Sequence, residues 1–265
     1  WDDAYEAAFE PHAAAGLLPA RVIKQQRGLS TLIAAGGEVE AGVSGRFRHL
    51  ATGPSDFPAV GDWVAVAQGS GRAAIHAVLP RRSAFVRKMA GEVVEAQVAA
   101  ANVDTVFLVS GLDGDFNLRR IERYLTTAWT SGASPVVVLN KSDLRNDLPD
   151  VLVAARQIAP GVPVAALKAL EAGGLEALAP YLVPRRTIAL LGSSGVGKST
   201  IVNRLLGEER LATATVSDAA EGRGRHTTTS RELVKLPGGA LLIDTPGMRE
   251  LQLWADDDGL DRTFD

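Results

Sequence analysis

The sequence predicts an α/β protein in which an N-terminal OB-like β-barrel precedes a mostly parallel sheet with helices on both faces. Three observations lead to this prediction. Residues 20–90 contain short strand-like segments separated by turns, as expected of a small barrel. Beyond residue 97, apolar runs of strand length alternate with helical stretches, which is typical of a parallel sheet. The length of 265 residues leaves room for two modest domains.

The composition is that of an ordinary globular protein. Basic residues number 28 and acidic residues 31, and 46% of the residues are hydrophobic. These values exclude wholesale disorder and a collagen-like fibre. No apolar run approaches the ~18 residues that a membrane span needs, so we expect no membrane contact. Cysteine is absent, which excludes disulfides and cysteine-ligated zinc sites within the chain and favours a reducing cytoplasm.

Charge is unevenly distributed along the first domain. Residues 1–19 carry four acidic side chains and no Lys or Arg, and we expect them to form an N-terminal extension. Residues 20–98 carry ten basic and six acidic side chains, which hints at an anionic partner for the barrel of residues 20–90. Such barrels often bind RNA, although a purely structural β-domain fits the same pattern. The predicted strands are 20–26, 30–35, 38–48, 62–68 and 73–80.

The second predicted domain, residues 91–265, carries the motifs. Ligands bind at the carboxyl ends of the strands in sheets of this kind, so residues that follow a strand are candidates for a site. The predicted strands are 103–109, 135–139, 162–165, 187–191 and 240–243, with helices at 118–129 and from 198 onward.

The segment Gly192–Ser199 fits the phosphate-binding pattern G-x-x-x-x-G-K-[ST] between a predicted strand and a predicted helix. Its glycines let the backbone approach phosphate, and the N–H groups at the helix N-terminus supply a positive field. Lys198 is expected to reach the β- and γ-phosphates, and Ser199 is expected to coordinate Mg²⁺.

A guanine-reading motif, N-K-x-D, occurs as Asn140-Lys141-Ser142-Asp143 after the strand at 135–139. The Asp143 carboxylate can accept hydrogen bonds from the N1–H and the exocyclic amine of guanine. The Asn140 amide and the Lys141 stem can hold the loop and the base. Adenine presents the wrong donors, so this motif predicts GTP rather than ATP.

A third motif, D-x-x-G, occurs as Asp244-Thr245-Pro246-Gly247 after the strand at 240–243. Asp244 is expected to hold Mg²⁺ through water, and the Gly247 N–H is expected to sense the γ-phosphate. A threonine upstream commonly completes the magnesium shell when its loop closes over GTP. Of the threonines at 227–229 we favour Thr228.

The motifs occur in a permuted order. An ordinary GTPase has the phosphate loop first, then D-x-x-G, then N-K-x-D, whereas here N-K-S-D comes first and D-T-P-G last. The same sheet and site can still form, because permutation joins the old termini and opens a loop elsewhere. The new opening lies just beyond D-T-P-G, so whatever follows the domain is connected directly to the nucleotide switch.

Together with this order, other segments make a family resemblance specific. They are Gly61-Asp62-Trp63-Val64, Val78-Leu79-Pro80-Arg81-Arg82-Ser83, Ala100-Ala101-Asn102-Val103-Asp104 and Gly224-Arg225-His226-Thr227-Thr228-Thr229. Over nearly its whole length the chain resembles the RsgA (YjeQ) family, small-ribosomal-subunit-dependent GTPases of bacteria and plastids. The resemblance implies hydrolysis of GTP to GDP and phosphate, stimulated by the small subunit, during late maturation of that subunit.

The resemblance also assigns residues and partners. It assigns guanine to Asn140, Lys141, Ser142 and Asp143, and the phosphates and magnesium to Gly192, Ser193, Ser194, Gly195, Val196, Gly197, Lys198, Ser199 and Thr200. We hypothesise that rRNA phosphates bind the basic barrel through Arg46, Arg48, Arg81, Arg82, Arg87 and Lys88. The expected protein is a cytoplasmic monomer.

The chain departs from the family pattern in two places. The family ends in a zinc domain with Cys and His ligands, whereas this chain stops at Asp265 without a cysteine, so we expect no zinc ion in it. Either the chain is truncated or this member has lost the domain. A second guanine-binding loop usually reads Ser-Ala-Leu before Gly-Leu. Here it reads Lys168-Ala169-Leu170, and the Ala169 N–H is expected to contact the guanine carbonyl.

The water-activating group is the least defined part of the prediction. Met248 follows D-T-P-G where many GTPases place a glutamine, and a thioether cannot orient water. His226 is the nearest titratable candidate, as the resemblance also suggests, with a solvated loop histidine as the alternative. A nucleotide-gated RNA-binding module with negligible hydrolysis fits the same residues, and N-K-S-D disfavours an ATP-using enzyme.

Overall fold

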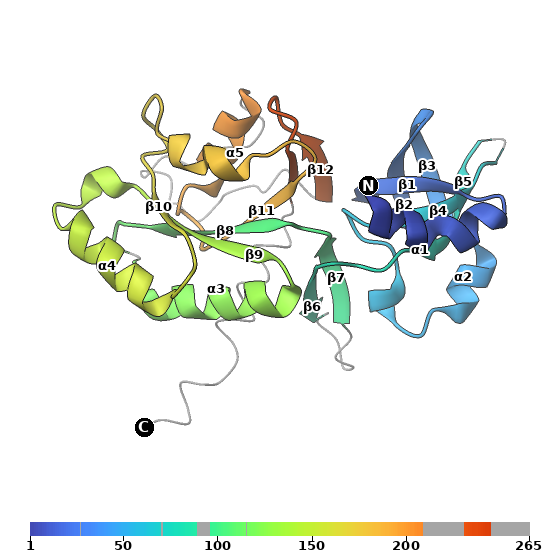
Figure 1. The fold of residues 1–265 in the computed structure, drawn as a ribbon, viewed down its shortest axis with the longest axis horizontal. Coiled ribbons are helices and arrows are strands. Elements are labelled where there is room, and N and C mark those ends of the chain that lie inside the picture. Colours follow the sequence, from blue (N-terminus) through green and yellow to red (C-terminus); the bar gives the residue numbers. More distant parts are fainter. Residues whose placement is uncertain (27, 70, 89–95, 115, 209–230, 245–265) are drawn as a thin grey trace, which may run out of the picture. The chain divides into compact units, whose positions relative to one another are not determined.

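The computed structural model describes residues 1–26, 28–69, 71–88, 96–114, 116–208 and 231–244 (Figure 1). These residues form two compact units. The first unit comprises the described residues within 1–103, together with 231–234 and 243–244. The second comprises the described residues within 104–208, together with 235–242.

The first unit contains the predicted barrel. Its strands are β1 (Leu18–Gln26), β2 (Leu29–Ala34), β3 (Gly37–Val43), β5 (Ala73–Val78) and β4 (Trp63–Ala67), in that spatial order, and β4 pairs with β1 to close the barrel. Neighbouring strands are antiparallel except for β3 and β5. Alternate side chains fill the interior, as the twofold repeat of a strand requires. They include Ala20, Val22, Leu32, Val64, Val66 and Ile75.

One predicted barrel strand is shorter than expected. The strand predicted at 38–48 ends at Val43, and α2 (Gly45–Leu50) follows. Ser44 causes the change, because its hydroxyl accepts a hydrogen bond from the Phe47 N–H at 3.1 Å and caps the helix. Phe47 then contacts Phe57 edge to face, beside the short 3₁₀ helix η1 (Pro54–Asp56). Arg46 and Arg48 are exposed on α2.

The acidic N-terminal extension is a helix, α1 (Asp3–Ala14), capped by Asp2. Tyr5 and Phe9 pack against Ala65 and Leu79 of the first unit, which contains the barrel and is called the barrel unit below. Within the same unit, β6 (Ala84–Lys88) and β7 (Ala96–Ala101) form an antiparallel pair.

The second unit contains a parallel sheet. Its strands follow the order β10 (Val164–Ala166), β9 (Ser134–Asn140), β8 (Thr105–Gly111) and β11 (Thr187–Leu191). In Figure 1, α3 (Leu118–Ser131) and α4 (Leu148–Ile158) lie on one side of this sheet and α5 (Lys198–Leu206) lies on the other. The core on the α5 side contains Phe107, Val109, Val136, Val138, Ile188, Leu190, Ile201 and Val202. Because the strands are parallel, the residues after β9, β10 and β11 meet at one edge of the sheet.

Shorter elements complete the fold. The 3₁₀ helices η2 (Ser142–Leu144) and η3 (Glu176–Tyr181) follow β9 and β10. β12 (Arg231–Lys235) pairs antiparallel with β1 and precedes β13 (Leu241–Asp244). Within the described ranges, no helix is both long and apolar enough to cross a membrane.

Candidate nucleotide-binding site

Two glycines allow the loop between β11 and α5 to take its path. Gly192 directly follows β11, and a Cβ built there would lie 2.1 Å from the Val109 carbonyl oxygen. Gly197 has a φ of +96°, and a Cβ there would lie 2.3 Å from Asn140 Nδ2. Side chains cannot be accommodated at such distances, so both positions require glycine. The loop therefore packs closely on β8 and on the end of β9.

Lys198 lies at the first position of α5 and folds back over the loop. Its ammonium group donates to the carbonyl oxygens of Gly192 and Ser193. Ser194 and Gly195 at the loop tip are exposed, whereas Val196 is buried. A positive side chain, exposed loop residues and a helix N-terminus thus come together at one loop, and such an arrangement can bind phosphate. Ser199 and Thr200 follow, half-buried, in the first turn of α5.

Asn140 joins the guanine motif to the phosphate loop. Its side chain is buried at the end of β9, and Nδ2 donates to the Val196 carbonyl oxygen at 2.9 Å. Its Oδ1 accepts a hydrogen bond from the Ala169 N–H at 3.1 Å. One amide side chain therefore bridges the phosphate loop, the N-K-S-D segment and the second guanine loop.

The rest of N-K-S-D presents Asp143 to solvent. Lys141 adopts a left-handed backbone conformation with a φ of +62°, and its ammonium group forms an ion pair with Asp113 after β8. Ser142 is buried, and its N–H donates to the Leu167 carbonyl oxygen at 3.0 Å. Asp143 is exposed on η2, so its carboxylate is accessible to a base.

The loop of residues 168–174 lies next to N-K-S-D and is held by hydrogen bonds within the protein. The Ala169 N–H, predicted to contact guanine, donates to Asn140 within the protein. The Ala169 carbonyl oxygen accepts from Arg204 Nη1 of α5 at 3.0 Å. Lys168, which stands where the family has serine, forms an exposed ion pair with Glu171 at 3.4 Å.

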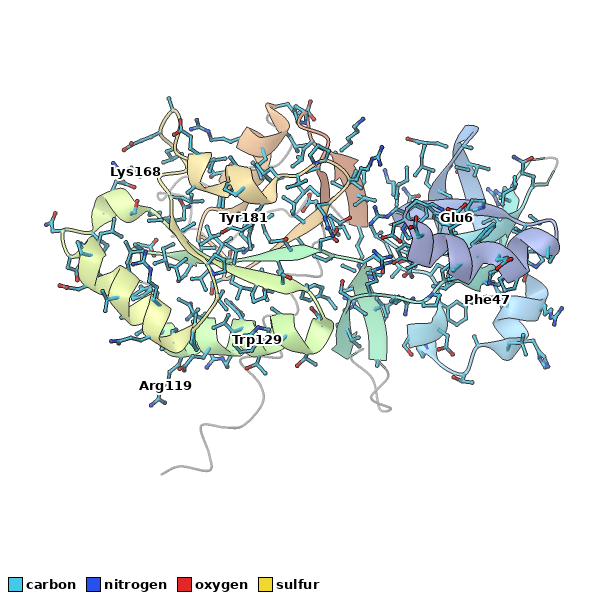
Figure 2. All side chains as sticks on the ribbon, in the orientation of Figure 1. Glu6, Phe47, Arg119, Trp129, Lys168 and Tyr181 are labelled. Atoms are coloured by element: carbon cyan, nitrogen blue, oxygen red, sulfur yellow. The ribbon has the colours of Figure 1, made fainter. Side chains whose placement is uncertain are left out.

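Two residues of α3 that the sequence prediction missed contact the phosphate loop. Arg120 Nη1 donates to the buried Ser193 hydroxyl at 2.9 Å, and the Tyr124 hydroxyl lies 3.3 Å from the same oxygen. Their i, i+4 spacing places both on one face of the helix, and this is the signal that could have found them. Arg119, by contrast, points away from the sheet (Figure 2).

Several predicted site residues lie outside the described part of the chain. They are Thr228, His226 and Gly247. Asp244 is described as the last residue of β13, and it is half-buried.

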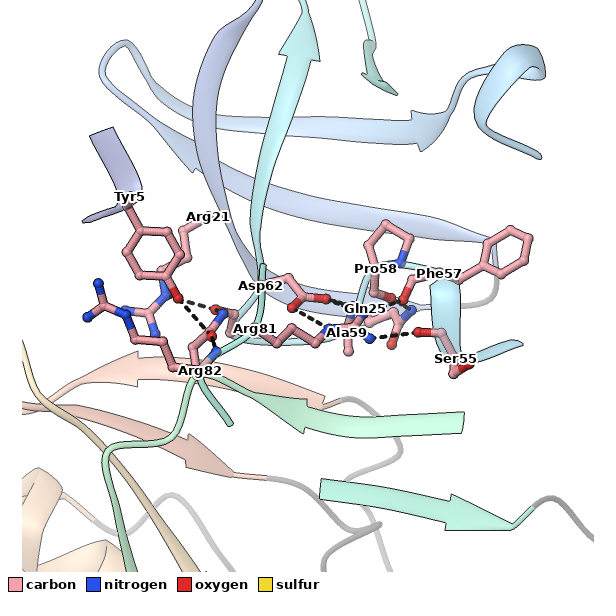
Figure 3. Close-up of polar contacts among 12 residues, drawn as sticks. Tyr5, Arg21, Gln25, Ser55, Phe57, Pro58, Ala59, Asp62, Arg81 and Arg82 are labelled. Carbon is pink, nitrogen blue, oxygen red and sulfur yellow. Dashed lines mark hydrogen bonds and ion pairs between the residues drawn. The ribbon is translucent and has the colours of Figure 1, made fainter. Parts of the chain in front are cut away.

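The basic residues of the first unit differ in how far their side chains are already engaged by partners within the protein (Figure 3). Arg81 forms a bidentate ion pair with the buried Asp62, with both N···O distances 2.8 Å. It also donates to the carbonyl oxygens of Ser55 and Phe57 at 2.6 and 2.9 Å. Burial raises the pKa of Asp62, and the Arg81 guanidinium opposes that rise. All of these contacts fasten the loop before β4, so the Arg81 guanidinium is directed into the protein.

Arg82 and Arg87 also have protein partners. Arg82 forms an ion pair with Asp2, which lowers the pKa of that carboxyl to about 2, and it stacks over Tyr5 at 4.3 Å. Arg87 donates to Gln97 Oε1 at 2.9 Å across the β6–β7 pair. Of the residues predicted to bind rRNA, Arg46 and Arg48 of α2 are exposed, and so is Arg82 with its Asp2 partner.

The chain is similar to known proteins over most of its length. A family model described as RsgA GTPase matches residues 78–254. A small ribosomal subunit biogenesis GTPase RsgA from Opitutus terrae is 54% identical over 100% of this chain and 75% of its own length. The protein of the same name from Syntrophotalea carbinolica is 46% identical over 100% of this chain and 74% of its own length.

Solved structures are similar as well. The crystal structure of YjeQ from Thermotoga maritima matches with a TM-score of 0.65 and 25% identity, over 89% of this chain and 76% of that one. YloQ, described as a circularly permuted GTPase, matches in fold with a TM-score of 0.60 and 20% identity, over 87% of this chain and 71% of that one.

Proposed function

The chain belongs to the RsgA GTPase family, and from this membership we propose that it acts in the biogenesis of the small ribosomal subunit. It is a GTPase, which hydrolyses GTP to GDP and phosphate. The Asn140 bridge is the observation that supports most directly where the nucleotide binds. It holds the base-reading segment beside the phosphate loop, as a guanine nucleotide that spans both would require.

We propose the following roles for the residues. Asp143 reads the N1–H and the 2-amino group of guanine, and Lys198 with the loop amides binds the β- and γ-phosphates. Mg²⁺ supplies charge neutralisation at the phosphates, and the oxygen donors of Ser199, Thr228 and Asp244 are of the chemical type it prefers. His226 would orient or deprotonate the attacking water.

We further propose that the partner is the small ribosomal subunit and that the barrel unit contacts its rRNA. The exposed arginines of α2 support this role, whereas the inward-directed Arg81 supports a structural one. With a ribosomal partner we also propose a cytoplasmic location.

The proposal can be tested by single-turnover hydrolysis of GTP by the purified chain, with and without small ribosomal subunits. We expect small subunits to raise the rate and large subunits to leave it unchanged. Lys198→Ala should abolish the stimulated rate because it removes the charge at the phosphates. A rate that small subunits do not change would instead favour an RNA-binding module in which GTP only sets the conformation.

A further inference from the structure

The polar groups of Ala169 are held by side chains from two different elements. Its N–H donates to Asn140 Oδ1 after β9, and its carbonyl oxygen accepts from Arg204 Nη1 on α5. Ala169 itself is buried, with 3% of its surface exposed. Two hydrogen bonds on a buried residue fix the backbone on both sides of its Cα.

The Arg204 hydrogen bond also orients the next amide. The Ala169 carbonyl and the Leu170 N–H belong to one planar trans peptide, so they point in opposite directions. Because Arg204 draws the carbonyl toward α5, the Leu170 N–H is directed away from α5. Leu170 is 86% exposed, which leaves this side of the loop accessible to a ligand.

Recognition of the guanine edge requires a hydrogen-bond donor of this kind. Guanine presents N1–H and a 2-amino group as donors and the adjacent 6-oxo group as an acceptor. Asp143 can match the donors only, so reading the acceptor requires a neighbouring N–H. The loop carrying Ala169 is fastened beside N-K-S-D by the Ser142–Leu167 and Ala169–Asn140 hydrogen bonds.

We propose that Arg204 is a positioning residue for guanine recognition, which directs the Leu170 N–H toward the 6-oxo group. This inference rests on the proposed binding of GTP. It moves the contact predicted for the Ala169 amide by one residue, because the Ala169 N–H is bonded to Asn140. Adenine carries a 6-amino group in place of the 6-oxo group. This amino group and the Leu170 N–H are both donors, so no hydrogen bond could form between them. Arg204 thereby links α5, which begins at the phosphates, to discrimination between bases.

The test measures the affinities of the full chain for GDP and for 6-thioguanosine diphosphate. The analogue keeps the N1–H and the 2-amino group and replaces the 6-oxygen with sulfur, a weaker hydrogen-bond acceptor. The wild-type chain should prefer GDP by about tenfold, the value of one hydrogen bond of ordinary strength. Arg204→Met should bring this ratio close to one by weakening GDP binding, with binding of the analogue nearly unchanged.

Two controls separate positioning from general damage. Asp143→Asn removes a contact that both nucleotides share, so it should weaken both and keep the ratio. Arg119→Met, on the outer face of α3, should change neither affinity. If Arg204→Met does not fold, Arg204→Gln, whose shorter side chain cannot span to the loop, should show the same loss of the ratio.

The outcomes are distinct. An unchanged ratio in the folded Arg204 variant overturns the positioning role. Failure of the wild-type chain to bind any guanine nucleotide would overturn the proposed function itself.

Discussion

Buried polar side chains connect the motifs of the candidate nucleotide site at the scale of single residues. Asn140 hydrogen-bonds to Val196 and to Ala169, which lie 56 and 29 positions later in the chain. The Ser193 hydroxyl likewise accepts a hydrogen bond from Arg120, which lies 73 positions earlier in the chain. A buried polar group that loses its partner costs about 1–3 kcal/mol, so each of these contacts strongly favours one arrangement of the loops.

The exposed Asp143 makes the base specificity testable. Asp143→Asn should shift the preference from GTP toward xanthosine triphosphate, because the new amide offers a donor where xanthine carries a carbonyl. Loss of such a complementary pair can change discrimination by several powers of ten. Direct titration with both nucleotides provides the measurement, and an unchanged GTP affinity would contradict the role of the motif.

The contact of α3 with the phosphate loop predicts a coupling between two side chains. Arg120→Ala and Ser193→Ala should each weaken GDP binding, because the Ser193 carbonyl oxygen that Lys198 contacts is no longer held in place. The double variant should lose little more than the worse single variant, with a coupling of about 0.5–3 kcal/mol. Additive losses, or an equal loss in the Arg119→Ala control, would show that the hydrogen bond does not serve the loop.

Among the elements, the loop before β4 and helix α2 divide the arginines of the barrel unit between stability and binding. Arg81 fastens the loop through Asp62, Ser55 and Phe57, whereas α2 displays Arg46 and Arg48 to solvent. Basic residues that look equivalent in the sequence therefore have different surroundings, and they should respond differently to substitution.

Arg81→Met should destabilise the chain by about 3–5 kcal/mol, because it leaves the buried Asp62 carboxylate without its partner. Denaturant unfolding measures this loss in the free energy of unfolding. The comparison is Arg82, whose ion pair with Asp2 is exposed. Arg82→Met should lower the free energy of unfolding far less, because water replaces the lost contact. Similar losses for the two variants would contradict the structural role of Arg81.

Helix α2 carries the matching prediction for binding. Arg46→Ala with Arg48→Ala should weaken association with small ribosomal subunits and should lower the salt slope of log K by about 1.5–2, the release expected from two phosphate contacts. Arg72→Ala is the control, since Arg72 is also exposed but pairs with Glu40 on the barrel. Binding that salt does not affect would point to a protein surface rather than to rRNA.

At the scale of the whole molecule, the two units have separate cores and separate proposed tasks. The first unit extends through β6 and β7 to residue 103, beyond the predicted barrel boundary at 90. A truncation at 90 would leave β7 without its partner β6. The position of the cut therefore matters for any experiment that divides the chain.

A fragment starting at residue 104 should retain GDP binding, because all the described contacts of the phosphate loop and N-K-S-D lie within the second unit. It should lose association with small subunits, because the barrel unit is missing. Calorimetry with GDP and co-sedimentation with subunits measure the two effects. Subunit binding by this fragment at the wild-type level would refute the role of the barrel.

The sequence by itself predicted the fold class, which the structure confirms, and it singled out the phosphate loop and N-K-S-D, whose nucleotide-binding roles stay predictions. Each of these depends on local pattern: strand periodicity, glycines that a tight loop requires, and residue types at fixed spacing after a strand. The short helix at 45–50 was missed, although Ser44 provides a local capping signal. The roles predicted for His226 and Thr228 remain predictions.

Only the tertiary structure decided which polar groups are already used within the protein. Arg81 and Arg46 have the same chemistry in the sequence, yet one pairs with a buried carboxylate and the other faces solvent. Likewise, the contacts of Ala169 depend on Arg204 and Asn140, which lie 35 and 29 positions away. Hydrogen bonds between distant segments form only when the sheet brings the ends of its strands together, and no local pattern records them.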